Sequence, residues 1–105
     1  MAIGDRNSHE LLNVVAVSGV QDPGWFASPK DNRAQIPFVF SLTAGTATFV
    51  LEGRNTPNDT PVQLATGSAS AKALVEKFMQ FKCRLSAATG ATCVGSVASQ
   101  LVKAS

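Results

Sequence analysis

The sequence predicts an all-β fold, an antiparallel β-sandwich of jelly-roll or immunoglobulin-like type with six to seven strands. Hydrophobic residues alternate with a period of two in several short runs, and clusters of Gly, Pro, Asn and Asp separate these runs. At 105 residues, 45% of them hydrophobic, the chain has room for one core. We therefore expect one sandwich domain over residues 11–100, between an N-terminal arm (1–10) and a C-terminal tail (101–105).

The first predicted strand is the valine-rich run Leu12–Ser18, which follows the polar arm. The next stretch, Gln21–Gln35, contains Asp-Pro-Gly at 22–24 and Ser-Pro-Lys at 28–30. Proline cannot donate a hydrogen bond to a strand ladder, and Asp and Gly favour turns. We therefore expect a long exposed loop here.

The runs Ile36–Leu42 and Thr46–Gly53 alternate in the manner of half-buried strands. Between them, Thr43–Gly45 has the composition of a hairpin loop. We therefore predict a β-hairpin over Ile36–Gly53. The side chains expected on its buried face are Phe38, Phe40, Leu42, Ala47, Phe49 and Leu51.

A second exposed loop is expected at Arg54–Pro61, where prolines and Asn or Asp residues cluster. Two short elements follow. Val62–Thr66 reads as a strand, and Ala69–Val75 reads either as a strand, which we favour, or as one or two helical turns beginning at Ala71.

The C-terminal third shows the cleanest alternation. The run Met79–Leu85 is followed by Ala87–Gly90, whose glycine suits the left-handed position of a hairpin turn, and by the run Ala91–Ala98. We predict two strands joined by that turn. The expected core residues are Met79, Phe81, Cys83 and Leu85 in the first strand, and Ala91, Cys93, Gly95 and Val97 in the second.

The charge content argues against several classes of partner. Nine Lys and Arg and seven Asp and Glu are spread along the chain without a basic run, so we expect no nucleic-acid partner. No apolar stretch is long enough to span a bilayer and no export signal is evident, so we expect no membrane partner. Only 15% of residues are charged, and uncharged surface on a small domain favours contact with other proteins.

The sequence contains no recognisable catalytic, metal or cofactor motif, so we expect no enzyme. His9, the one histidine, lies in the polar arm, where a surface position is expected. Glu52 faces outward on a strand and Asp59 lies in a loop, so nothing sets the separation that paired catalytic carboxylates need. Cys83 and Cys93 could form a disulfide or remain buried thiols, and without an export signal we expect free thiols.

Trp25 and Phe26 are the most informative residues of the first loop. One interpretation is that they cover an end of the core. Another is that they anchor a partner protein, because aromatic residues are enriched at interface centres. A third is sugar stacking, for which a second aromatic platform is missing.

Two stretches resemble a known family. Ile-Pro-Phe-Val-Phe-Ser-Leu at 36–42 and Gly-Thr-Ala-Thr-Phe-Val-Leu-Glu-Gly at 45–53 resemble small β-sandwich virion proteins of tailed bacteriophages, in which a Gly-Thr-Ala-Thr-Val type strand ends in Glu-Gly. The segment 81–97, with Ala-Thr-Gly-Ala at 88–91, resembles their closing hairpin. After Glu-Gly such proteins often carry Asp-Gly and a Trp, whereas this chain has Arg-Asn-Thr-Pro-Asn at 54–58.

The resemblance implies a capsid decoration or cement protein on the exterior of a virion assembled in the host cytoplasm. Its expected partners are the major capsid protein, neighbouring virion subunits and further copies of itself as a dimer or trimer. The N-terminal arm would reach a neighbour. Alternatives are a small tail or baseplate component and a carbohydrate-binding module. The residues expected to bind a partner are Trp25, Phe26, Arg54, Asn55, Asn58 and Asp59.

Overall fold

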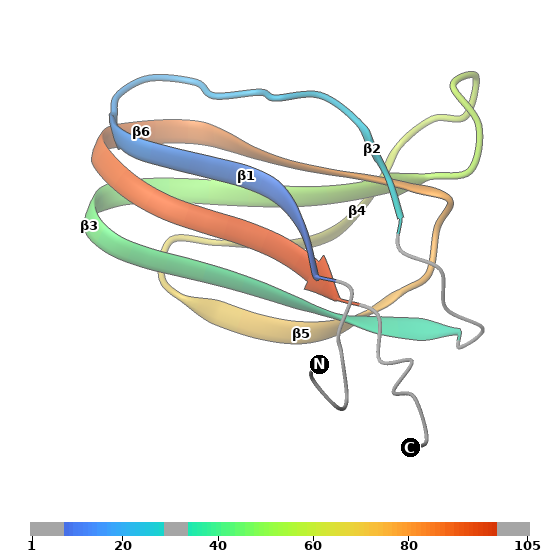
Figure 1. Cartoon of the computed structure of the whole chain (residues 1–105). Helices are drawn as coiled ribbons and strands as arrows, with labels where there is room; N and C mark the ends of the chain where they lie inside the picture. Colours follow the sequence, from blue (N-terminus) through green and yellow to red (C-terminus); the bar gives the residue numbers. More distant parts are fainter. Residues whose placement is uncertain (1–7, 29–33, 99–105) are drawn as a thin grey trace, which may run out of the picture.

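The protein is all-β in a computed structural model that describes residues 8–28 and 34–98 (Figure 1). The described strands are β1 (Ser8–Val17), β2 (Phe26–Ala27), β3 (Gln35–Arg54), β4 (Val62–Gly67), β5 (Ala71–Glu76) and β6 (Gln80–Ala98). They form one antiparallel sheet. The predicted fold class is therefore confirmed.

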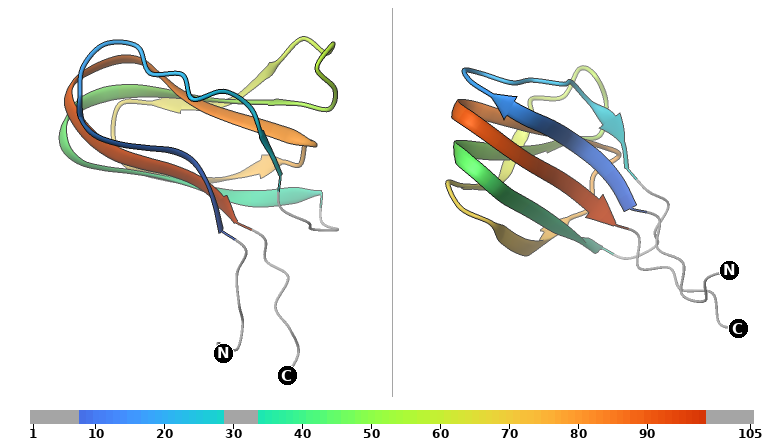
Figure 2. Two further views of the ribbon diagram at one scale, coloured as in Figure 1. Left: turned by 45° about the horizontal axis from the view of Figure 1, so that its top comes forward. Right: turned by 60° about the vertical axis from the view of Figure 1, so that its left-hand side comes forward.

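The sheet is folded back on itself into two layers, as both views in Figure 2 show. The first half of β3 pairs with the second half of β6, and the second half of β3 pairs with the first half of β6. The first layer therefore has the order β1-β6-β3-β5, and the second layer has the order β2-β6-β3-β4. When β3 and β6 are each counted as two strands, this is the eight-strand order of a jelly roll.

The two predicted hairpins are wrong, and the reason lies at the bend between the layers. The halves of β3 do not pair with each other but with different partners, and the same holds for β6. Gly45 and Gly90 lie at this bend with φ of 74° and 56°. A Cβ atom at Gly45 would collide with the backbone carbonyl of Gly90, so two strands cross the bend side by side only because glycine is present.

Nearly all of the core residues predicted from the alternation of hydrophobic residues are buried. Every expected core residue is buried except Leu42, which is half-buried, and Met79, which is 61% exposed because β6 begins one residue later. Val50, which the same alternation places on the outer face, is also buried. The largest fully buried side chains come from both layers: Phe38, Phe40, Phe49, Phe81, Leu11, Ile36, Leu51, Leu85 and Val97.

The two cysteines are free and buried, as expected. The Sγ of Cys83 in the second layer lies against Gly95 of the first, where a Cβ atom would be only 2.7 Å from it. Burial raises the pKa of the Cys83 thiol to about 12, and burial also raises the pKa of Cys93. Both thiols are therefore poor nucleophiles in the folded protein.

The remaining elements agree with expectation except at their boundaries. The stretch Ala69–Val75 contains a strand, β5, rather than helical turns. The loop predicted at Gln21–Gln35 includes the short strand β2, and β1 begins at Ser8, inside the predicted arm. Residues 1–7 of that arm, and the predicted tail 101–105, lie outside the described residues.

Candidate protein-interaction site

Trp25 lies on the outer face of the second layer, which the sequence alone did not predict. The next residue, Phe26, pairs directly with the buried Phe81 and so points to the core side at the edge of the sheet. The half-buried indole is stacked by two cations. The guanidinium carbon of Arg54 lies 4.2 Å, and the Nζ of Lys82 5.1 Å, from the ring centroid. Both distances are within the range of cation–π attraction.

Strand pairing positions the Arg54 side chain. Arg54 is the last residue of β3 and lies opposite Gln80, the first residue of β6. The Nε of Arg54 donates a hydrogen bond to the Oε1 of Gln80 at 2.7 Å. A guanidinium held in this way loses less conformational entropy when a partner binds it.

Alternating charges continue along the same face. Lys82 contacts Asp22 at 3.3 Å and Glu52 at 3.8 Å, and the Nε of Arg84 lies 3.5 Å from Glu52. Glu52 and Lys82 are directly opposite in the β3–β6 ladder, and each side chain is 17% exposed. Such pairs contribute at most about 1 kcal/mol each, so their main effect is to hold Lys82 over the indole ring.

Part of the second predicted loop is ordered by its own side chains. The Oδ2 of Asp59 accepts hydrogen bonds from the backbone N–H groups of Asn55 and Thr56, at 3.1 and 3.0 Å. These two bonds are the largest causes that lower the pKa of Asp59, the bond from Thr56 first. The Oδ1 of Asn55 accepts a hydrogen bond from the backbone N–H of Met79 at 3.0 Å. Asn55 and Asp59 thus shape the loop, while Asn58 is exposed.

The structure brings two of the predicted partner-binding residues into contact, Trp25 and Arg54. Phe26 is 39% exposed at the sheet edge. Sequence reasoning missed the strand residues that complete the site. They alternate with the residues predicted to face the core, so alternation also indicates their outward position. We use "Trp25 cluster" for Trp25, Arg54, Lys82, Asp22, Glu52, Gln80 and Arg84.

Other kinds of site find little support in the described residues. Among them, no three His, Cys, Asp or Glu side chains are arranged to hold a metal ion. His9 belongs to β1, where its backbone pairs with Val97, rather than to a free arm. Within residues 8–28 and 34–98 no helix is long and apolar enough to cross a membrane.

Comparisons with protein-family models, with curated proteins and with solved structures found no match. The site must therefore be interpreted from its own chemistry. A tryptophan on an exposed sheet face, stacked by an arginine whose position is fixed, combines two of the residue types most enriched at the energetic centres of protein interfaces.

Proposed function

We propose that the protein is a non-catalytic structural subunit of a virion, of the capsid decoration or cement type, which binds the outer shell through the Trp25 cluster. The contact of Arg54 with the Trp25 ring at 4.2 Å is the observation that carries the proposal. Two residues expected to bind a partner lie far apart in sequence, Trp25 just before β2 and Arg54 at the end of β3, yet their half-buried side chains form one patch.

The electrostatics of the patch suit such a role. Its charges are mixed and mutually paired: the carboxylates of Asp22 and Glu52 lie beside Lys82, and Glu52 also lies beside Arg84. A paired network favours binding to a surface of complementary pattern over binding to any polyanion or polycation. A decoration protein needs only to bind the assembled shell in order to stabilise it.

The fold is compatible with this proposal, because jelly-roll sandwiches occur in viral capsid domains, and they occur in lectin domains as well. The alternative of a carbohydrate-binding module has one observation in its favour, namely a tryptophan on an outer face. Against it, Arg54 and Lys82 both lie over the ring that a sugar would stack upon. A tail or baseplate subunit would use the same patch on a different protein surface.

The test is to mix the purified chain with undecorated phage capsids and to measure both co-sedimentation and the melting temperature of the shells. We expect association and a higher melting temperature. Trp25→Ala and Arg54→Ala should each weaken association without changing the circular dichroism spectrum. Ser68→Ala, at an exposed residue that follows β4 and lies outside the Trp25 cluster, is the control and should bind normally. Binding to a glycan array without binding to shells would replace this proposal with the carbohydrate one.

A further inference from the structure

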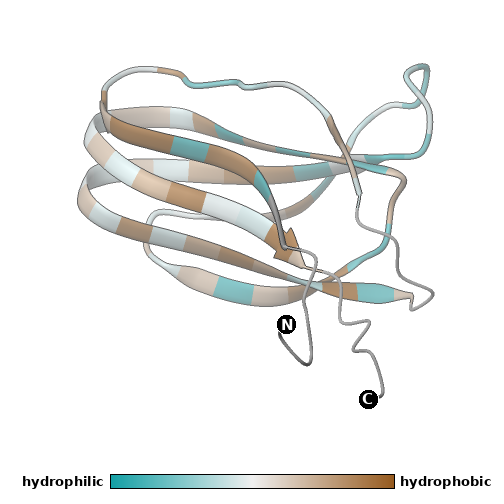
Figure 3. Cartoon of the chain, in the orientation of Figure 1, coloured by the Kyte–Doolittle hydropathy of each residue, from teal (hydrophilic) through white to brown (hydrophobic). Residues whose placement is uncertain are grey.

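The outer face of the first layer differs in chemistry from the Trp25 cluster. Its two central strands, the second half of β6 and the first half of β3, contain no charged residue. In Figure 3 they are coloured mainly white and brown, the colours of neutral and hydrophobic residues. Val39 is 41% exposed there, and Leu74 on the neighbouring β5 is 64% exposed. We call this surface the central-strand face. Its outward residues on β6 and β3 are Thr92, Val94, Ser96, Ala98, Pro37, Val39 and Ser41.

Charges lie at the margins of the face, on its two outer strands. One row of the ladder crosses all four strands: Glu10 of β1 lies opposite Ser96, Ser96 opposite Val39, and Val39 opposite Lys72 of β5. The row is therefore acidic at one end and basic at the other, about 14 Å apart at the usual strand spacing. Glu76, at the far end of β5, is the other charged residue that the described strands place on this side.

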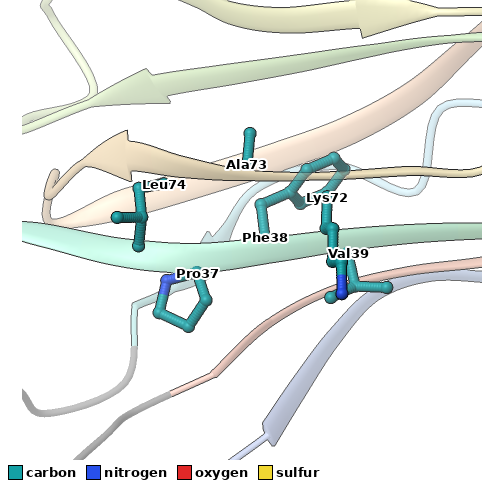
Figure 4. A pocket seen from close by; sticks show the side chains of 6 residues that line it. All are labelled: Pro37, Phe38, Val39, Lys72, Ala73 and Leu74. Atoms are coloured by element: carbon teal, nitrogen blue, oxygen red, sulfur yellow. The ribbon is translucent and has the colours of Figure 1, made fainter.

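The face is hollowed between β3 and β5. A shallow cavity of about 350 Å³ lies beside Pro37, Val39, Lys72 and Leu74, and the walls exposed within it are mostly apolar. In Figure 4 Pro37, Val39 and Lys72 extend to the same side of the β3–β5 ribbon. An apolar hollow rimmed by a charge is a surface that a protein partner can cover.

We propose that the central-strand face is the interface of a symmetric dimer, and that its occupant is a second copy of this chain. A two-fold axis that runs parallel to the strands, between β6 and β3, places β1 of each copy over β5 of the other. Ser96 then lies over Val39 of the second copy. Glu10 then lies over Lys72 of the second copy, and symmetry repeats both contacts.

The charges select this axis over the alternative. A two-fold axis perpendicular to the strands would place β1 over β1 and β5 over β5, bringing like charges together at both margins. The parallel axis instead brings opposite charges together on either side of an uncharged centre, which is the usual anatomy of a protein interface.

The size of the face is sufficient for a dimer. Eight residues of β6 at about 3.3 Å each, and four strands at about 4.8 Å, give a face of about 500 Å² per copy. The total of about 1,000 Å² for both copies reaches the lower end of specific interfaces. The dimer would carry one Trp25 cluster on each of its two outer surfaces, so it could bridge two partners. Dimer formation does not depend on the proposed function.

The experiment is sedimentation of the full chain over a wide range of concentrations. We expect a reversible monomer–dimer equilibrium. Glu10→Lys and Lys72→Glu should each raise the dissociation constant about tenfold or more, because each substitution reverses two symmetric pairs. The double variant, with both charges exchanged, should regain most of the wild-type affinity. Gln63→Lys, on the outer face of the second layer, is the control for net charge.

Cross-linking tests the axis independently. Chains carrying Ser96→Cys and chains carrying Val39→Cys are mixed and oxidised, and the mixed disulfide should exceed either homodisulfide. The native thiols are buried and should not compete. Two results would overturn the proposal: a chain that stays monomeric at every concentration, or a dimer that neither charge reversal weakens. A monomer that still covers capsids through Val39 would assign this face to the shell.

Discussion

The two outer faces of the sandwich are built from the same two strands, yet they present opposite chemistry. In the second layer, β3 and β6 carry Glu52, Arg54, Lys82 and Arg84 outward, and these side chains pair with one another or stack on Trp25. In the first layer, the other halves of β3 and β6 carry no outward charge. One strand can therefore serve two kinds of surface if it crosses from one layer to the other.

The largest loss of stability should come from a substitution at the bend between the two layers. Gly45→Ala would force a Cβ atom into the backbone of Gly90 at a φ of 74°. We expect a loss of about 3 kcal/mol or more in the free energy of unfolding, measured by urea denaturation. Gly90→Ala is the matched control: its φ is 56° but its Cβ would meet open space, so we expect a loss of about 1 kcal/mol. Equal losses would contradict this account of the bend.

The next effect tests the spacing between the two layers. Gly95→Ala would place a methyl group 2.7 Å from the Sγ of Cys83. We expect a loss of about 1 to 3 kcal/mol in the free energy of unfolding from overpacking. Combining it with Cys83→Ala removes the opposing sulfur, so the double variant should be more stable than the sum of the two single losses implies. Strict additivity would show that the two residues do not meet.

A smaller loss of stability should distinguish the salt-bridged charges of the second layer from Glu10 of the first, whose carboxylate accepts a hydrogen bond from the side-chain amide of Asn13. Glu52→Gln removes the partner of Lys82 and Arg84, so we expect a loss of about 0.5 to 1 kcal/mol in thermal or urea unfolding, decreasing with added salt. Glu10→Gln removes an exposed carboxylate from the first layer. At concentrations where the chain is monomeric it should change stability by less than about 0.5 kcal/mol. Comparable losses in the two variants would remove the distinction between the faces.

The smallest change in stability is expected from the loop beside the Trp25 cluster, and it depends on pH. Because its two backbone hydrogen bonds lower the pKa of Asp59 below 3.8, Asp59 adds stability that is fully present above that value. This stability is lost as the pH falls through the lowered pKa, in the range below about 4. Stability curves of the wild type and of Asp59→Asn should therefore converge at acid pH. Curves that stay parallel would show that the carboxylate does not depend on those bonds.

Sequence reasoning located the core and the loops but not the pairing of the strands. Alternation at Phe38, Phe40 and Phe49 correctly predicted buried side chains, because it depends only on the geometry of a single strand. The residues around Gly45 are equally compatible with a chain reversal and with a bend. Which of the two occurs depends on whether a neighbouring strand crosses at the same place, and Gly90 of β6 lies 45 residues away in sequence.

For the candidate site, too, the sequence predicted some individual residues but not the contacts between them. The importance of Arg54 and Trp25 could be predicted, because composition and turn residues are local properties, although Arg54 is half-buried at the end of β3 rather than exposed in a loop. The contact between these two side chains, the position of Lys82 over the same ring and the ion pairs of Glu52 could not be predicted, because strand register determines these contacts. The sequence by itself determined the alternating runs, their inward faces and the low charge of the chain. Only the tertiary structure decided which outward residues become neighbours, because strand pairing joins residues that lie far apart along the chain.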